Sequence, residues 1–377
     1  MKVKNLEIKN LRNHDYSKLN FASSINIFFG LNGAGKTTIL EAIAMSALTK
    51  SFTVYSDDHL INFNSEDFDI NIELERDRGT CFSLKTTKNK RSRKRIVSTF
   101  QDNMKPKEVI GLIPIIILSP DAKDITFGSP ENRRKFIDST ISQISNLYLE
   151  DLYRYNKVLK QRNILLKKII DLHEFEDGQL RLWTDKLIDI GSRIIKKRAI
   201  FIKEIKPKFE HYYSIISDNR EDVSLKYEPN GFKKHDIHEL DIEDIKLILH
   251  EYSKQKKETE YRRQTTMFGP HKDELELYIN DHIVRDTASQ GQHKSVLISL
   301  KLSEFDYIRE SHNEIPIVLL DDIFSELDEK RIKLVLKIVN ENLAQAFVTI
   351  TEVDKIKRIL FDTPEVKYFE VKEGKIK

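Results

Sequence analysis

The stretch INIFFGLNGAGKTTILEAIA, residues 25 to 44, constrains the fold more than any other part of the chain. Its segment from Gly30 to Thr37 fits the pattern G-x-x-x-x-G-K-S/T, in which a glycine-rich loop holds phosphate groups. Glycines such as Gly33 and Gly35 let the backbone take positive φ angles and approach an anion closely. A buried strand candidate precedes the loop and a helical pattern follows it. The sequence therefore predicts a P-loop nucleotide site in an α/β domain.

Each part of this loop has an expected role. The Lys36 ammonium supplies charge to the β- and γ-phosphates of ATP or GTP and is the first catalytic candidate, and the Thr37 hydroxyl is a candidate Mg²⁺ ligand. Backbone amides and the N-terminus of the following helix point at the same anion. The residues expected to contact the nucleotide are Gly30, Leu31, Asn32, Gly33, Ala34, Gly35, Lys36, Thr37 and Thr38.

An apolar run near the other end of the chain ends in two acids, in the segment IPIVLLDDIFSELD from Ile315 to Asp328. In P-loop NTPases an aspartate after a buried strand organises Mg²⁺. Asp321 is therefore the metal-side candidate, and Asp322 is the catalytic candidate that polarises the attacking water. Asp322 has one methylene fewer than a glutamate, which predicts slow hydrolysis. The alternative is a strand end that carries two solvated acids.

A second helix start has the features of an anion-binding site. In TASQGQHKSVLISLKLSEF, a small hydroxyl residue and a glycine precede an apolar helix face. Such a start can cap the helix and bind a phosphate group. The candidate nucleotide-binding residues here are Ser289, Gln290, Gly291 and Gln292. The alternative is an ordinary serine-capped helix, because one nucleotide in one chain does not need two such helix ends.

The character of the sequence changes twice along its 377 residues. Short strand-like segments dominate to about residue 120, and long charged helices with almost no glycine run from about 131 to 265. A strand-like segment, DVSLKYEPNGF, interrupts these helices once, and strands and helices alternate again after them. We therefore expect an α/β ATPase head (lobe I) formed by residues 1–130 and 266–377, with a helical insertion (lobe II) formed by residues 131–265.

Two basic stretches are candidates for contact with DNA. The formal net charge is only +3, so attraction to nucleic acid must come from local patches. The denser stretch is KTTKNKRSRKR, from Lys85 to Arg95, and ENRRKF with Arg133 and Arg134 opens the helical region. Lysine and arginine contacts to phosphates give sequence-independent affinity, and no base-reading motif is present. A solvated hairpin tip is the alternative for the first stretch.

Cysteine content and hydropathy indicate where the protein works. The single cysteine, Cys81, excludes a disulfide framework and a multi-cysteine zinc site, and it suits a reducing cytosol. The N-terminus MKVKNLEIKNLRNHD has no apolar signal core, and no apolar run approaches membrane-spanning length. We therefore expect a cytoplasmic protein with no membrane partner.

The order of these motifs resembles the ABC-type P-loop ATPase heads of the SMC-like class. In that class a signature sequence stands where this chain has ASQGQ, and a D-loop stands where it has SELD, from Ser325 to Asp328. SMC-like heads also often place a phosphate-facing arginine at the position of Arg12, in NLRNH; the alternative is a solvated arginine after an edge strand. The segments LSPDAKDITFGSPENRRKFID, YNKVLKQRNILL and GPHKDELELYIN are similar to the RecF family of bacterial recombination mediators, and the resemblance covers essentially the whole chain.

This resemblance implies an ATP-dependent homodimer in which ATP and Mg²⁺ lie between the P-loop of one subunit and the signature of the other. It also implies binding to single-stranded DNA and to gapped or junction duplex DNA in recombinational repair and replication. Weak DNA-dependent ATP hydrolysis would release the protein. The family further implies help in loading the RecA recombinase, with RecR and RecO as partners, which nothing in the residues indicates directly.

The chain departs from transporter-type ABC ATPases at three places. Gln290 replaces a usual glycine, and Thr349 or Thr351 stands where a switch histidine is usual. The segment LSPD, which ends at Asp121, stands where those proteins have their Q-loop. The nucleotide-binding subunit of a membrane transporter is therefore the less favoured alternative. Another SMC-like ATPase head is the second alternative, but coiled-coil arms need hundreds of residues, and only about 135 are available between the two parts of the head.

Overall fold

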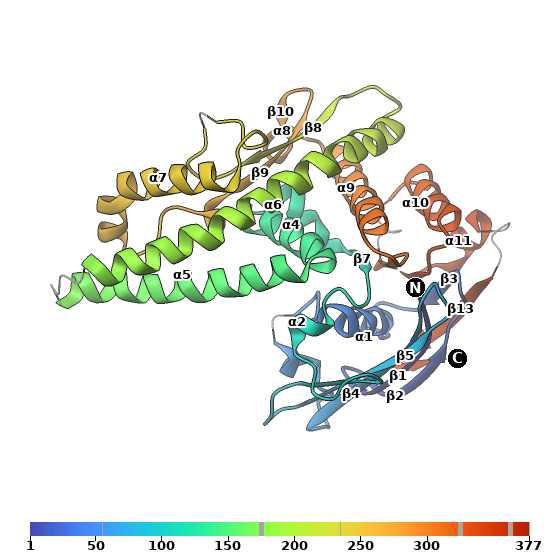
Figure 1. Cartoon of the computed structure of the whole chain (residues 1–377). Helices are drawn as coiled ribbons and strands as arrows, with labels where there is room; N and C mark the ends of the chain where they lie inside the picture. Colours follow the sequence, from blue (N-terminus) through green and yellow to red (C-terminus); the bar gives the residue numbers. More distant parts are fainter. Residues whose placement is uncertain (55, 173–176, 234, 323–326, 361–364, 377) are drawn as a thin grey trace. The chain divides into compact units, whose positions relative to one another are not determined.

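The structure is a computed structural model that describes residues 1–54, 56–172, 177–233, 235–322, 327–360 and 365–376. The chain divides into two compact units, Met1–Lys123 with Lys294–Lys377, and Asp124–His293. The first unit contains both ends of the chain (Figure 1). The predicted head included residues 266–293, but these cluster with the second unit, because β9 (Glu274–Ile279) pairs there with β8 (Val223–Glu228).

The first unit is built on two sheets. One is antiparallel with the strand order β2-β1-β4-β5-β6, and the other has the order β14-β13-β3-β12-β11-β7 and is parallel except for its last hairpin. The antiparallel strands are β1 (Lys2–Leu11), β2 (His14–Asn20), β4 (Asp67–Glu75), β5 (Cys81–Asn89) and β6 (Arg95–Ser98). The others are β3 (Ile25–Phe29), β7 (Ile115–Leu118), β11 (Ile317–Leu320), β12 (Ala346–Ile350), β13 (Val366–Lys372) and β14 (Lys375–Ile376). The apolar runs predicted before the P-loop and before Asp321 are confirmed as strands β3 and β11, and both pair in the parallel sheet.

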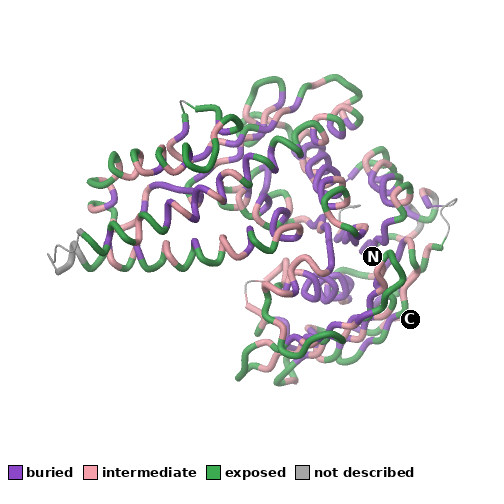
Figure 2. The backbone as a smooth tube through the Cα atoms, in the orientation of Figure 1, coloured by how far each residue is buried: buried purple, intermediate pink, exposed green. Residues whose placement is uncertain are grey.

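Helix α1 (Lys36–Leu48) lies between the two sheets. It contacts β1, β4 and β5 of the antiparallel sheet, and β7 and β12 of the parallel one. Eleven of its thirteen residues are buried, so the helix is covered almost all round (Figure 2). The P-loop is thereby held between β3 and a helix that has little freedom to move.

The first unit has further helices, and one helix spans the boundary between the units. Helix α9 (Gln290–Ser311) begins at the end of the second unit and continues into the first. Asp328 caps α10 by accepting a hydrogen bond from the Arg331 amide at 2.9 Å. The other helices are η1 (Asp57–Leu60), α2 (Pro106–Val109), η2 (Pro120–Lys123), α10 (Glu329–Glu341) and α11 (Val353–Ile359).

The second unit consists mainly of long helices, as predicted, with a small sheet in the order β10-β9-β8. Helix α6 packs along α5 and contacts α7 and β8 (Figure 1). Its elements are α3 (Asp124–Phe127), α4 (Pro130–Ile144), α5 (Asn146–Leu172), α6 (Asp177–Ser217), α7 (Ile242–Arg263), η3 (Pro270–Lys272), β10 (His282–Ile283) and α8 (Val284–Thr287). Among all described residues, no helix combines the length and apolar character that crossing a membrane requires.

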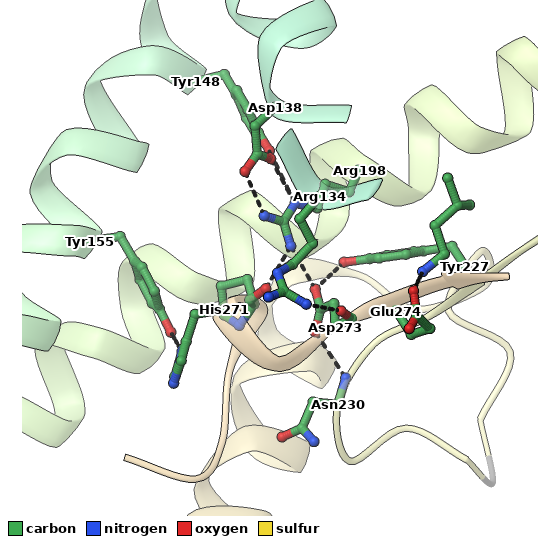
Figure 3. Close-up of polar contacts among 12 residues, drawn as sticks. Arg134, Asp138, Tyr148, Tyr155, Arg198, Tyr227, Asn230, His271, Asp273 and Glu274 are labelled. Carbon is green, nitrogen blue, oxygen red and sulfur yellow. Dashed lines mark hydrogen bonds and ion pairs between the residues drawn. The ribbon is translucent and has the colours of Figure 1, made fainter. Parts of the chain in front are cut away.

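A buried polar network ties the start of β9 to the helices of the second unit (Figure 3). Arg198 of α6 is 3% exposed and donates to both carboxylate oxygens of Asp138 on α4, at 3.0 and 2.9 Å. Its Nη1 donates to Asp273, which is fully buried, at 2.9 Å. The Tyr227 hydroxyl and the Asn230 amide also donate to Asp273. Every charge at the centre of the network therefore has a partner.

Candidate nucleotide-binding site

The glycines of the P-loop have distinct structural requirements. Gly30, Gly33 and Gly35 have φ angles of 151°, 78° and 108°, which L-residues with a side chain rarely adopt. A Cβ at Gly30 would lie 2.2 Å from the carbonyl oxygen of Val371, and one at Gly35 would lie 2.5 Å from His14 Nε2. A Cβ at Gly33 would meet nothing within 4 Å. Backbone conformation alone requires glycine at Gly33, whereas close packing also requires it at the other two.

Two turns of the antiparallel and parallel sheets support the loop from outside. The Asn13 side chain donates to the Gly33 carbonyl at 3.2 Å, and His14 Nε2 lies 3.0 Å from the Gly35 carbonyl. The Gly374 amide, in the turn between β13 and β14, donates to the Ala34 carbonyl at 2.9 Å. Burial lowers the pKa of His14, so its imidazole stays neutral and Nε2 carries the proton that this bond needs. No motif of the sequence predicted these three contacts.

Lys36 is only 7% exposed at the start of α1. Its Nζ donates to the carbonyl oxygens of Gly30 at 2.7 Å and Leu31 at 2.9 Å. Burial lowers the Lys36 pKa, while the charges of Asp322 and Asp321 oppose that shift. The ammonium is thus held inside the loop that it is predicted to serve.

The structure brings together the two predicted Mg²⁺ ligands, which are far apart in sequence. Asp321 follows β11 and is 5% exposed, and its Oδ1 accepts from the Thr37 hydroxyl at 2.9 Å and from the Thr349 hydroxyl at 2.7 Å. Burial raises the Asp321 pKa, and the charges of Asp322 and Glu41 add to the rise. Of the two threonines considered for the switch position, Thr349 makes this contact and Thr351 is exposed.

The donor set at Thr37 and Asp321 suits Mg²⁺. This ion is usually held by one or two carboxylates together with substrate phosphates and water, not by a cage of protein ligands. Within the described ranges, no group of three or more His, Cys, Asp and Glu residues could hold a metal by itself. One carboxylate beside one hydroxyl at the start of α1 is the arrangement that a nucleotide-bound Mg²⁺ needs.

Asp322 has a left-handed backbone, with φ of 48°, and its amide donates to Thr349 Oγ1 at 2.8 Å. Aspartate tolerates this conformation better than longer side chains, because its short carboxylate can bond locally. The left-handed backbone therefore gives a structural reason for an aspartate at this position. Its short side chain separately predicts slow hydrolysis. Residues 323–326 lie outside the described residues, and with them the first part of the predicted D-loop, including Ser325.

Arg12 lies in the turn between β1 and β2 and reaches α1. Its Nε lies 2.7 Å from Glu41 Oε2, and its Nη2 donates to Glu41 Oε1 at 3.0 Å and to the Thr53 hydroxyl. Glu41 is fully buried. Glu41 was not among the predicted site residues, although an acid inside an otherwise apolar helix is a usable sequence signal. The guanidinium is therefore fixed by an ion pair to α1.

The signature residues form the start of α9 in the second unit. Ser289, Gln290 and Gly291 are exposed. The Ser289 amide donates to the Gln292 side chain at 2.7 Å, and the Gln292 amide donates to Ser289 Oγ at 3.3 Å, which is a reciprocal cap. Gln292 Nε2 also donates to Glu221 at 2.7 Å. The helix start is thus well ordered and presents its first residues to solvent.

The two basic stretches differ in the structure. The predicted hairpin exists, formed by β5 and β6. The prediction that Arg133 lines a DNA-binding face is wrong, because Arg133 is 4% exposed and forms two hydrogen bonds to Glu274, at 2.8 and 2.9 Å. Arg134 is half-buried and donates to the Asp273 carbonyl (Figure 3). The buried Arg133 guanidinium neutralises Glu274, so its charge is not available to a phosphate group of DNA.

Comparison with known proteins gives consistent results. Residues 5–212 match the family described as AAA domain. The chain is 33% identical to the DNA replication and repair protein RecF of Bacteroides fragilis over 378 residues, covering 100% of this chain and 98% of that protein. It is 35% identical to the protein of that name from Streptococcus gordonii, covering 100% of both.

Solved structures agree with this. The structure of the recombination mediator protein RecF-ATP in the RecFOR pathway has a TM-score of 0.91 and 29% identity, covering 100% of this chain and 97% of that chain. The Smc head domain of Pyrococcus furiosus has a TM-score of 0.58 and 14% identity, covering 100% of this chain and 95% of that chain, which indicates a shared fold only. The predicted α/β ATPase-head fold is confirmed.

Proposed function

The chain belongs to the RecF family, and we propose that it is an ATP-dependent mediator of DNA recombination that uses nucleotide binding as a switch. The observation that carries this proposal is the contact of Thr37 with Asp321 at 2.9 Å, beside a buried Lys36. It joins the loop that suits phosphates to the carboxylate that suits Mg²⁺. The ATP complex of a related RecF supports ATP as the nucleotide.

Within the site, the chain's own residues divide the work. Lys36 and the amides of the P-loop would bind the β- and γ-phosphates, and Arg12 would add charge from the β1–β2 turn. Thr37 and Asp321 would hold Mg²⁺, which supplies charge neutralisation at the phosphates. Asp322 would orient and polarise the attacking water. We propose slow, DNA-dependent hydrolysis that releases the protein from DNA.

We further propose that ATP drives head-to-tail pairing of two subunits. Two observations support this: one chain carries two helix starts suited to anions, and the exposed one, Ser289 to Gln292, is already ordered by its own cap. In a two-fold dimer both composite sites form together. ATP that binds the pair better than the single subunit shifts the equilibrium toward the pair.

The partners of the dimer follow from the family. We propose that the paired form binds single-stranded DNA and gapped or junction duplex DNA through its backbone, without sequence preference. We also propose that it acts with RecR and RecO to load the RecA recombinase; the RecFOR pathway named for the related structures supports this. Met1–Lys123 with Lys294–Lys377 would act as the ATPase head, and Asp124–His293 as the helical insertion.

A substitution in the P-loop tests the nucleotide switch. Lys36→Met should lose ATP binding and ATP-induced pairing, measured by nucleotide titration and by analytical ultracentrifugation. Lys50→Met, an exposed lysine two residues beyond the same helix, is the matched control and should behave as wild type. A Lys36→Met protein that still pairs on addition of ATP would refute the assignment.

A substitution in the signature tests whether that segment acts on the nucleotide of the other subunit. Ser289→Arg should block pairing while ATP binding by the single subunit stays within about twofold of wild type. Thr287→Arg, also exposed and just before the signature, is the control. Loss of ATP binding by Ser289→Arg at protein concentrations too low for pairing would contradict this reading.

A further inference from the structure

The basic hairpin of the first unit has two kinds of positive residue. Its lysines face acids of neighbouring segments: Lys85 pairs with Asp69, Lys88 with Asp58, Lys90 with Glu66 and Lys94 with Asp57. The short helix η1 and the loop before β4 supply three of these acids. The lysines therefore fix the hairpin in place, and most of their charge is balanced within the molecule.

The arginines of the same hairpin are different. Arg91, Arg93 and Arg95 are exposed, and no hydrogen bond or ion pair of the described residues reaches their guanidinium groups. Arginine presents a planar fork of donors that matches phosphate geometry. Three such groups within five residues, on a hairpin held by ion pairs, form a positive edge with no balancing acid bound to it.

A fully exposed aromatic ring lies in the loop before β4. The Phe63 side chain is 99% exposed. The turn that carries it is ordered, because the Asn62 amide donates to the Asn10 carbonyl, and Asn62 accepts from the amides of Asn64 and Ser65, at 2.9, 2.9 and 3.0 Å. Isolated exposed apolar residues are common. A rigid turn that holds a phenylalanine away from the core makes the ring available to an external partner.

Lys90 joins this turn to the tip of the hairpin. Its amide donates to the Glu66 carbonyl at 3.0 Å and its Nζ donates to the Ser65 carbonyl at 2.8 Å. Asp67 at the start of β4 pairs with Asn89 at the end of β5, which puts both loops at the same end of the antiparallel sheet. Phe63 and the three arginines thus belong to one edge.

We propose that this edge, formed by Phe63, Arg91, Arg93 and Arg95, binds a single-stranded stretch of DNA. The arginines contact successive phosphates, and the Phe63 ring stacks on an unpaired base. Arginine charge around an aromatic platform is the combination that binds single strands without sequence preference. The positive charge favours a polyanion over an apolar protein surface. The inference rests on the DNA binding of the proposed function and names the part of the chain that recognises the unpaired strand.

Fluorescence anisotropy with labelled oligo-dT, gapped duplex and blunt duplex, at saturating ATP and two salt concentrations, tests the proposal. Phe63→Ala should weaken binding to oligo-dT and gapped duplex at least about 5-fold, since stacking on one base contributes that much or more, and should leave blunt duplex within about twofold. Phe63→Trp should bind like wild type, and Phe63→Leu should be as weak as alanine, because it keeps an apolar side chain but loses the flat face. Because Phe63 is exposed, each variant should fold normally, which thermal unfolding and ATP binding verify.

The salt dependence of oligo-dT binding tests the role of the three hairpin arginines. Arg91→Ala, Arg93→Ala and Arg95→Ala combined should weaken oligo-dT binding and flatten its dependence on salt by about two units of slope, at about 0.7 for each lost phosphate contact. Arg78→Ala is the matched control, because this exposed arginine lies in the turn at the opposite end of β4 and β5.

The outcomes separate the two proposals. If wild type binds gapped DNA in an ATP-dependent way but Phe63→Ala and the arginine variant bind as wild type, only the proposed edge is wrong. A Phe63→Leu protein with full affinity would also overturn it, since a partner that needs only an apolar side chain would then be indicated. If wild type binds none of the three DNA probes, the proposed function fails and this inference with it.

Discussion

The buried network around Arg198 permits a quantitative prediction. We consider Arg198→Met, which removes the guanidinium and keeps an apolar side chain. Burial lowers the Arg198 pKa, but its neighbours, Asp138 first among them, raise it well above the ordinary value, so the residue is charged at every accessible pH. The substitution leaves Asp273, which is fully buried, without its positive partner. Removing one member of a buried ion pair costs about 3–5 kcal/mol, because the other charge is left uncompensated.

The same helix offers a matched control. Arg193 also pairs with two aspartates, Asp151 at 2.9 Å and Asp189 at 2.7 Å, but it is 34% exposed. Water screens such a pair, so Arg193→Met should cost no more than about 1 kcal/mol. The comparison between Arg198→Met and Arg193→Met therefore tests burial, because the helix, the charge and the number of aspartate partners stay the same.

Urea denaturation followed by tryptophan fluorescence is the assay. Trp183 is the only tryptophan of the chain and lies in α6, so its emission reports on the second unit. Linear extrapolation to zero urea gives the free energy of unfolding, and a thermal scan of the same variants should show a loss of about 3–5 kcal/mol as a melting temperature lowered by about 6–20 °C. Equal losses for Arg198→Met and Arg193→Met would refute the reasoning.

Acidification supplies a second check on the same variant. Burial already raises the pKa of Asp273 above 3.8, while Arg198 opposes the rise. Without Arg198 the Asp273 pKa rises further, so its carboxylate takes up a proton at a higher pH than in the wild type as the solution is acidified. The difference in stability between wild type and Arg198→Met should therefore shrink on acidification. Arg198→Met combined with Asp273→Asn should recover about 2 kcal/mol of the loss at neutral pH.

Three further outcomes are expected at the nucleotide site. Asp321→Asn should raise the melting temperature at neutral pH and abolish Mg²⁺-dependent hydrolysis. Because burial raises the Asp321 pKa, the stability that its protonated form contributes is lost as pH rises through that pKa, so the advantage of the asparagine should disappear once the pH falls below the ordinary carboxyl value of 3.8. An unchanged melting temperature at neutral pH would contradict this. Gly33→Ala should cost only the left-handed backbone energy of about 1–2 kcal/mol, whereas Gly30→Ala, with its Cβ 2.2 Å from the Val371 carbonyl, should cost clearly more in the same thermal melts. Asp322→Asn should bind ATP within about twofold of wild type and hydrolyse it at least about 100-fold more slowly in a phosphate-release assay; full turnover would rule out its role as the polarising base.

The local parts of the site could be predicted from the sequence because local patterns determine them. The P-loop combines a glycine spacing, a preceding buried strand and a following helix, all within about 20 residues. The acid that follows β11 was identifiable because parallel strands of this class end at the same edge of the sheet. Its contact with Thr37 then follows from the order of strands, in which β11 and β3 both flank β12.

Other features depend on contacts between distant segments, and no short pattern reveals those. The bonds from Asn13, His14 and Gly374 to the P-loop require β2 and the last hairpin to meet the loop in space. Arg133 was misread because a run of positive residues looks the same in sequence whether it is solvated or paired with a distant acid such as Glu274.

The electrostatics of the site explain why its two charged residues act as a pair. Burial lowers the Lys36 pKa and raises that of Asp321, so the protein interior disfavours the charged form of both. The charge of Asp321 partly opposes the shift at Lys36. Phosphate oxygens would stabilise the Lys36 ammonium, and a divalent cation would stabilise the Asp321 carboxylate. Nucleotide and Mg²⁺ together would therefore offset the cost of burying both charges, whereas either alone would offset only one. Asp321→Asn should accordingly weaken ATP binding more at high pH than at neutral pH, because Lys36 then loses its proton more easily; a pH-independent loss of affinity would show that the two residues act separately.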